Sequence, residues 1–138
     1  MLDFIKVVEN ILEEQGKSKQ VLFEDKIVSE NTFFKYRHRY PSLATVLKIA
    51  NLLNVSLDYM FDFDNENHYK PYSVNSIRFY ENLMEWIKSK RISARQFCKD
   101  LGYSKDNIAR WKNGTQPTIQ RLLEMTQYFG CSIDDLIV

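Results

Sequence analysis

The chain of 138 residues repeats itself at a fixed spacing. When it is slid along itself by 75 positions, apolar residues fall on apolar residues and cap residues on cap residues, as with Phe4 on Phe79 and Ser29 on Ser104. Past Arg39 the shift becomes 76, and "SLDYMF" then meets "SIDDLI". Because the match lies in the apolar pattern and the turns rather than in the surface residues, it predicts one backbone shape used twice.

Both copies are expected to be helical throughout. In the second copy, apolar residues recur at the spacing of one helix face: Ile77, Tyr80, Leu83 and Ile87. No stretch alternates apolar and polar residues for long enough to indicate a strand. The joint between the copies is polar and contains Pro71, which is typical of a linker. The sequence therefore predicts an all-α chain with domains at residues 1–62 and 75–138 and a linker at 63–74.

Composition and the scarcity of metal-binding side chains exclude several classes of protein. Hydrophobic residues make up 44% and charged residues 27%, which indicates a soluble globular chain. No apolar run approaches the ~18 residues that cross a bilayer, and the N-terminus lacks a signal-peptide pattern, so we expect a cytoplasmic protein without a membrane partner. Because only Cys98, Cys131, His38 and His68 are available, we expect neither a disulfide framework nor a metal site.

Patterns that would indicate an enzyme are also missing. The chain has 4 glycines and no glycine-rich loop that could cradle a phosphate. No histidine is placed near a plausible nucleophile, and Asp100 and Asp106 flank a turn among basic residues, which is typical of caps and ion pairs. We therefore expect neither enzymatic activity nor a bound cofactor.

Charge is unevenly spread along the chain, although the formal net charge is only +1. Residues 1–66 carry a net −3 and residues 67–138 a net +4. The excess is greatest over residues 88–112, where eight Lys or Arg stand against two Asp, a net +6. A solvated helical surface can have this composition, but a patch that meets phosphate is the stronger interpretation.

The same basic stretch carries an ordered pattern of helix ends and buried positions. From Ile92 to Pro117 the order is IS-x-x-x-F-C-x-x-LG-Y-S-x-x-x-I-x-x-W-x-NG-x-x-P. The spacing, the turn glycine, the small Cys98 at the helix crossing and the proline together resemble the Cro/repressor-type (Xre-like) helix-turn-helix (HTH) family. The resemblance implies a five-helix, lambda-repressor-like domain whose third helix enters the major groove of DNA. Applied to both copies, it implies two such domains in tandem.

The resemblance also implies which residues of the second copy touch DNA. The residues expected to face base edges are Ser104, Lys105, Asp106, Asn107 and Arg110. The residues expected to meet phosphates are Ser93, Arg95, Gln96, Lys112, Asn113 and Thr115. Ile108 and Trp111 are expected to face inward. Lysine and arginine suit guanine, and aspartate can accept a hydrogen bond from cytosine, so these residue types are compatible with base reading.

Two residues of the second copy depart from the family pattern. Ala94 stands where the family commonly has glutamine, which removes a group that braces a phosphate and a neighbouring side chain. Lys112 stands where the family commonly has glutamate, which adds positive charge near the DNA backbone. Neither change is expected to undo the fold.

The first copy departs further. Ile27 stands at the turn position of Gly102, where a β-branched residue at positive φ costs at least ~1–2 kcal/mol, so we expect a different turn. Phe23 replaces the small residue at the helix crossing. Phe34 is either a partial core residue under a shifted helix or a partner or dimer contact, and less readily a thymine contact. Weaker DNA contacts are expected from Asn31, Thr32, Lys35, Arg37 and Arg39.

Together these observations predict a sequence-specific, double-stranded DNA-binding transcriptional regulator of the repressor type that reads DNA mainly with its second copy. The first copy would act as a second reader or as a dimerisation module, and we expect a homodimer because small domains of this kind bind weakly alone. The alternative is an antitoxin-like or anti-repressor-like adaptor that uses the same fold to bind a protein. The acidic first copy and Phe34 favour this alternative, with a protein partner at the N-terminal domain.

Overall fold

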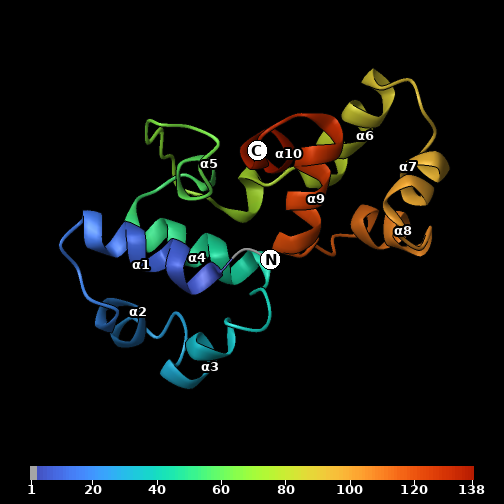
Figure 1. Cartoon of the computed structure of the whole chain (residues 1–138). Coiled ribbons are helices and arrows are strands. Elements are labelled where there is room, and N and C mark those ends of the chain that lie inside the picture. Colours follow the sequence, from blue (N-terminus) through green and yellow to red (C-terminus); the bar gives the residue numbers. More distant parts are fainter. Residues whose placement is uncertain (1–2) are drawn as a thin grey trace. The chain divides into compact units, whose positions relative to one another are not determined.

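The computed structural model describes residues 3–138, and over these residues the chain is all-α, without a strand (Figure 1). The chain divides into two compact units between Tyr72 and Ser73, here called unit 1 and unit 2. No helix among the described residues combines the length and the apolar character that crossing a membrane requires.

Among residues 3–138 each unit has five α-helices, and unit 2 also begins with one turn of 3-10 helix. The helices of unit 1 are α1 (Phe4–Glu14), α2 (Gln20–Glu24), α3 (Glu30–Lys35), α4 (Leu43–Leu53) and α5 (Leu57–Met60). Those of unit 2 are η1 (Val74–Ser76), α6 (Phe79–Ser89), α7 (Ala94–Leu101), α8 (Asp106–Lys112), α9 (Ile119–Phe129) and α10 (Ile133–Ile137).

The helix bounds follow the spacing found in the sequence. Helices α1 and α6 have the same length and lie 75 positions apart, and α4 and α9 have the same length and lie 76 apart. Asn54, with φ 53°, follows α4 as its C-cap, and Gly130, with φ 69°, follows α9, so both C-caps are left-handed at matching positions. The two units therefore repeat one succession of helices. That unit 1 is itself an HTH domain stays a prediction.

The turn after α2 has a different shape from the turn after α7, as the sequence indicated. Helix α7 has eight residues and is followed by its C-cap Gly102, with φ 72°. Helix α2 has only five, and the positive φ of 56° falls on Lys26, one residue before the position that matches Gly102. Ile27 thereby avoids the left-handed conformation that its branched side chain disfavours.

The polar segment that was expected to be a linker is folded onto unit 1 from residue 64 to residue 72. The side chain of Asn51 on α4 donates from Nδ2 to the carbonyl of Tyr72 at 2.9 Å, and its Oδ1 accepts from the backbone N–H of Tyr72 at 2.8 Å and from Tyr69 Oη at 3.0 Å. Tyr72 Oη in turn accepts from the backbone N–H of Leu57 at 2.8 Å. The expected linker at 63–74 is therefore corrected, because most of it belongs to unit 1.

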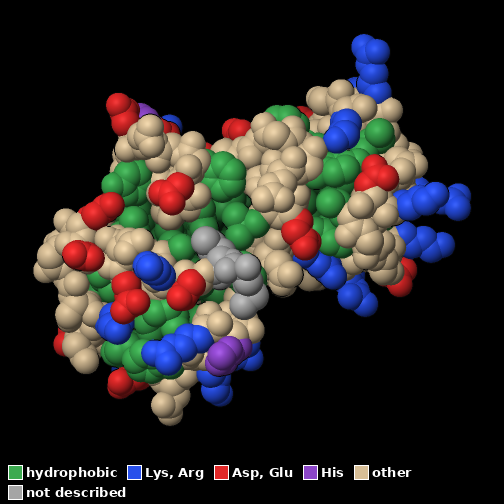
Figure 2. All heavy atoms as spheres, viewed as in Figure 1, with side chains coloured by type: hydrophobic (Ala, Val, Ile, Leu, Met, Phe, Trp, Pro, Cys, Tyr) green, Lys and Arg blue, Asp and Glu red, His purple; other side chains and the backbone are tan. Residues whose placement is uncertain are grey.

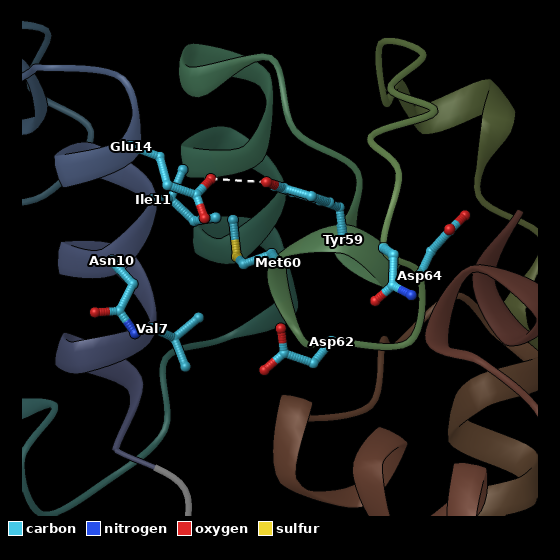
Figure 3. A pocket seen from close by; sticks show the side chains of 9 residues that line it. Val7, Asn10, Ile11, Glu14, Tyr59, Met60, Asp62 and Asp64 are labelled. Atoms are coloured by element: carbon cyan, nitrogen blue, oxygen red, sulfur yellow. Dashed lines mark hydrogen bonds between the residues drawn. The ribbon is translucent and has the colours of Figure 1, made fainter.

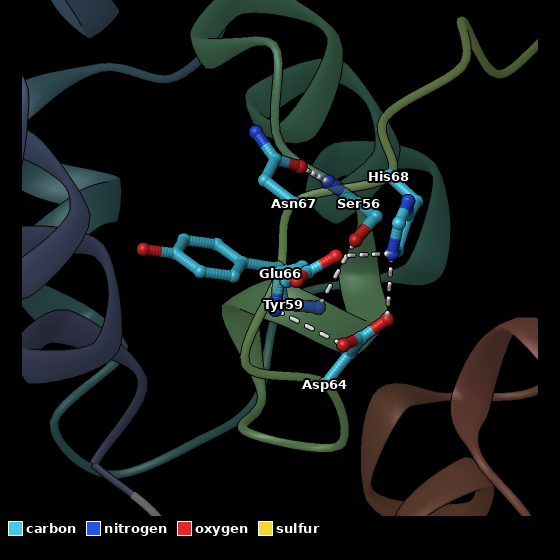
Figure 4. Close-up of polar contacts among 6 residues, drawn as sticks. All are labelled: Ser56, Tyr59, Asp64, Glu66, Asn67 and His68. Atoms are coloured by element: carbon cyan, nitrogen blue, oxygen red, sulfur yellow. Dashed lines mark hydrogen bonds and ion pairs between the residues drawn. The ribbon is translucent and has the colours of Figure 1, made fainter.

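The same segment supplies part of the N-terminal cap of α5. Asn67 Oδ1 accepts from the backbone N–H of Ser56 at 3.0 Å (Figure 4). Asn67 Nδ2 donates to the carbonyl of Asn54 at 2.8 Å. His68 Nε2 lies 3.3 Å from Glu66 Oε2 and 3.7 Å from Asp64 Oδ2. The segment is polar, yet it is not a free tether. Its polar groups form hydrogen bonds with the backbone and side chains of unit 1.

Candidate nucleic-acid interface

A glycine turn sets the start of α8 against the end of α7. Gly102 adopts φ 72°, and the backbone N–H of Tyr103 then donates to the carbonyl of Cys98 at 2.8 Å while that of Gly102 donates to Lys99 at 3.3 Å. This pair of bonds is a Schellman motif, which closes α7 and turns the chain at once. The turn leaves Ser104 and Lys105 exposed at the start of the next helix.

Aromatic packing holds the inner side of α8. Trp111 is 4% exposed, and its ring packs edge-on against two other rings. The distance between ring centres is 5.3 Å to Phe79 and 6.2 Å to Tyr103. Phe97 on α7 is fully buried and stacks on Phe129 at 5.5 Å. Since α8 has only seven residues and isolated helices shorter than ~12–15 residues are marginal in water, this core is what keeps α8 helical.

A polar network fixes the first turn of α8, and it corrects one predicted contact. Asn107 was expected to face base edges, but it is only 7% exposed. Its Oδ1 accepts from Arg121 Nη1 at 2.9 Å, and its Nδ2 donates to the carbonyl of Ser104 at 3.1 Å. Asn107 is therefore a bracing residue between α8 and α9, because the protein already uses both of its polar atoms.

The network also includes Glu124 and the phenol of Tyr103, and the sequence did not indicate that these two groups pair. Tyr103 Oη donates to Glu124 Oε1 at 2.5 Å, and the guanidinium of Arg121 lies 4.9 Å from the centre of the Tyr103 ring. Burial, followed by the hydrogen bond to Glu124, raises the pKa of Tyr103 far above its usual value, so the phenol remains a donor. The only available signal was that Tyr103, Arg121 and Glu124 carry polar groups next to apolar core positions.

The other residues expected to face base edges lie on the outer side of α8. Ser104, Lys105, Asp106 and Arg110 are all exposed, as is Ala109 between them. Ser104 Oγ accepts from the backbone N–H of Asp106 at 3.3 Å. The structure thus brings these side chains to one solvent-facing side of the helix, while their contact with bases stays a prediction.

The residues expected to meet phosphates are exposed as well: Ser93, Arg95, Gln96, Lys112, Asn113 and Thr115. Ser93 Oγ caps α7 by accepting from the backbone N–H of Gln96 at 3.0 Å, and Gln96 Nε2 donates to Asp100 Oδ1 at 2.5 Å. Figure 2 shows Lys and Arg side chains projecting from the side of unit 2 that α7 and α8 form. Cationic groups therefore surround the start of α8.

One cation of the basic stretch is turned away from α8. Lys90 Nζ donates to the carbonyl of Tyr128 at 3.1 Å and lies 3.7 Å from the centre of its ring. Tyr128 Oη donates to Asp100 Oδ2 at 2.6 Å, which lowers the pKa of Asp100 below its usual value. Burial and the same hydrogen bond raise the pKa of Tyr128 to about 12. These contacts stabilise the end of α7 against α9.

A groove opens between α7 and α8 where the family commonly has glutamine. It has a volume of about 530 Å³ and is lined by Ala94, Arg95, Cys98, Lys105 and Ile108. Ile108 was expected to face inward, but it is only half-buried and lines the groove together with the small side chain of Ala94. The apolar floor of this groove lies beside the exposed ammonium group of Lys105.

In unit 1 the corresponding surface is built differently. Phe34 is half-buried, and its ring centre lies 6.0 Å from that of Phe33. Two cations lie over the Phe34 ring: Lys19 Nζ is 5.5 Å and the Arg37 guanidinium 5.4 Å from the ring centre. This is the position of a partial core residue covered by two cations. Of the five weaker candidates, Thr32 is half-buried and its hydroxyl accepts from Ser29 Oγ at 2.9 Å. The exposed ones are Asn31, Lys35, Arg37 and Arg39.

Residues 82–138 match the family model of the Cro/C1-type HTH DNA-binding domain. Comparison with curated proteins found no match, and comparison with solved structures found none. The matched residues run from α6 through α10 and contain the turn, the exposed side of α8 and the basic surface described above. The C-terminal part of the chain therefore carries an HTH domain of the Cro/C1 type.

Proposed function

We propose that the chain is a sequence-specific, double-stranded DNA-binding transcriptional regulator that reads DNA with α8. The observation that carries the proposal is the start of α8, where Ser104, Lys105, Asp106 and Arg110 are exposed within a segment that matches a DNA-binding domain. Lysine and arginine can donate to guanine, and aspartate can accept from cytosine. Asn107 takes no part in this reading, because it braces the helix from inside.

Phosphate contacts would position α8 in the groove. The N-terminus of α7 offers Arg95 and Gln96, and the segment after α8 offers Lys112, Asn113 and Thr115, all exposed. Such contacts fix the register of a protein on the duplex and supply most of the salt-dependent affinity. Unit 1 would serve as a second reader or as a dimerisation module, and a homodimer would place two α8 helices on two half-sites.

The proposal is tested by selecting binding sites for the full chain from random duplexes and titrating the selected site at 50 and 200 mM salt. With a slope of about −0.9 per phosphate, three phosphate contacts would weaken binding roughly fortyfold between these concentrations. Failure to enrich any sequence would contradict sequence-specific reading. Affinity that is independent of salt, or stable capture of a protein without DNA, would favour the adaptor instead.

A further inference from the structure

The groove between α7 and α8 has apolar walls that remain open to solvent. Ala94 on α7 and Ile108 on α8 both line it and are only half-buried. The buried Cys98 lies four residues after Ala94, on the same face of α7, and adds to the apolar lining. The groove therefore offers apolar surface on the same side of unit 2 as the exposed residues of α8.

Two cations without acidic partners stand at this groove. Lys105 lies three residues before Ile108 and is therefore its neighbour on the surface of α8. Arg95 follows Ala94 on α7, and both Lys105 and Arg95 are exposed. Within residues 3–138 neither of them forms an ion pair. An apolar groove edged by unpaired cations is complementary to an apolar group that is carried on a polyanion.

Unit 1 has a different surface at the matching place. At the offset of 75, larger residues stand at the three apolar positions: Lys19 for Ala94, Phe23 for Cys98 and Phe33 for Ile108. The rings of Phe23 and Phe33 pack with their centres 6.1 Å apart, and Phe33 is fully buried. Glu30 stands in place of Lys105, which reverses the charge. In the part of the chain that the structure describes, unit 2 alone thus combines small apolar side chains with a cation here.

The pocket beside α1 in unit 1 has the opposite charge. It is lined by the carboxylates of Glu14, Asp62 and Asp64, and no Lys or Arg is among the described residues that line it. Figure 3 shows the Glu14 carboxylate, whose Oε2 accepts from Tyr59 Oη at 2.7 Å. Because carboxylates repel phosphate, a duplex is expected to approach the groove of unit 2 rather than this pocket.

Thymine is the base whose major-groove edge matches the groove of unit 2. Of the four unmodified bases it alone carries a methyl group there, beside the O4 acceptor. Guanine offers acceptors to a lysine but no methyl group, and cytosine presents an N4 amino donor, which an ammonium group cannot accept. An apolar wall next to Lys105 therefore favours thymine over the other bases.

We propose that the groove receives the C5 methyl group of one thymine of the DNA site. The methyl group lies against Ala94 and Ile108, Lys105 donates to O4 of the same base, and Arg95 meets the neighbouring phosphate. Because the groove, at about 530 Å³, is larger than a methyl group, the adjoining apolar edge of the base enters with it. This inference rests on the proposed function, since α8 has to lie in the major groove. It makes Ala94 and Ile108 specificity-determining residues.

The experiment replaces single thymines of the selected site and titrates the full chain with each duplex. Uracil in place of thymine removes the C5 methyl group and keeps O4 and the pairing with adenine. At one thymine position we expect uracil to weaken binding about fourfold, as for one methyl group that loses its apolar contact. A 5-methylcytosine–guanine pair at that position keeps the methyl group but replaces O4 by a donor, and we expect it to bind more weakly than the thymine pair.

Two matched variants test whether the groove carries the effect. Ala94→Gln fills the groove and should make thymine and uracil bind alike at that position. Ala44→Gln makes the same change at an exposed position of α4 in unit 1 and should keep the fourfold preference. Glutamine is a good helix former, so both variants should fold, and circular dichroism checks this. The uracil series uses the unchanged protein and decides independently of either variant.

The outcomes separate this inference from the proposed function. If no sequence is enriched in the selection, both fall together. If a site is enriched but lacks thymine, or binds equally well with uracil at every thymine position, this inference alone is overturned. A uracil effect that persists in Ala94→Gln places the methyl group outside the groove and also overturns it. Binding of the 5-methylcytosine duplex as tight as that of the thymine duplex overturns the assignment to thymine.

Discussion

Arg121 on α9 donates from Nη1 to Oδ1 of Asn107 at 2.9 Å and so ties α9 to the first turn of α8. Asn107 is buried at the start of a helix whose outer side carries the candidate reading residues. The bond therefore links the stability of unit 2 to the placement of those residues, although neither partner is expected to touch a base.

Replacing Asn107 tests this bracing role. Asn107→Ala leaves the Arg121 guanidinium without its partner and should lower the free energy of unfolding by about 1–3 kcal/mol, as measured by urea denaturation. Because Asn107 is inside, binding to all DNA sequences should weaken alike. Asp106→Ala, one position earlier and exposed, is the matched control for a base contact. If Asn107→Ala altered base preference and left stability unchanged, Asn107 would have to reach the DNA.

Lys105 and Lys112 are expected to separate base reading from phosphate binding. Lys105→Ala should lose about 1–3 kcal/mol of discrimination at one base position, because its ammonium group is exposed at the start of α8. Lys112→Ala should weaken binding to all sequences alike and reduce the salt slope by about 1. Titrations of the selected site and of single-base variants at several salt concentrations measure both effects. Equal effects of the two changes on every site would contradict this assignment.

Glycine should be the more stable residue at both helix turns, because both positions have a positive φ. Gly102→Ala places a side chain at φ 72° and should destabilise unit 2 by about 1 kcal/mol. Lys26→Gly removes a side chain from φ 56° and should stabilise unit 1. Thermal unfolding of the two variants checks the signs. A loss of stability in Lys26→Gly would show that the Lys26 side chain contributes more than its backbone conformation costs.

Residues 64–72 are expected to be required for the stability of unit 1. Asn51→Leu removes the group that binds both polar atoms of the Tyr72 backbone and should cost about 1–3 kcal/mol. The exposed Asn31→Leu is the control. Hydrogen exchange should show that the amide of Tyr72 loses protection in Asn51→Leu alone. An unprotected Tyr72 amide in the unchanged protein would mean that this segment is a free tether.

Tyr128 and Asp100 predict a stability change at acid pH. The hydrogen bond from Tyr128 holds the pKa of Asp100 below its usual value. A carboxyl whose pKa is lowered by folding contributes stability above its unfolded pKa, about 3.9, and loses it as pH falls through the folded value. The free energy of unfolding should therefore fall more steeply below about pH 4 in the unchanged protein than in Tyr128→Phe. Identical acid profiles would contradict the assignment.

The helices and the exposed side of α8 were predictable because they rest on local signals. Turn glycines, serine caps and apolar spacing act within one helix or between neighbouring helices, and they are visible in the chain itself. The role of Asn107 was not predictable, since it depends on Arg121, which lies on another helix. The 64–72 segment was misjudged for a related reason, because its polar residues pair with the backbone and side chains of α4 and α5.

Helix α8 is too short to remain helical without the packing of Trp111 on Phe79 and Tyr103. One side of the helix therefore serves stability, and the opposite side is left for binding. Its inward positions are constrained by the core, whereas its outward positions are free of packing constraints. Exchanging the outward residues is therefore expected to change which DNA sequence is preferred, while the melting temperature of unit 2 stays the same.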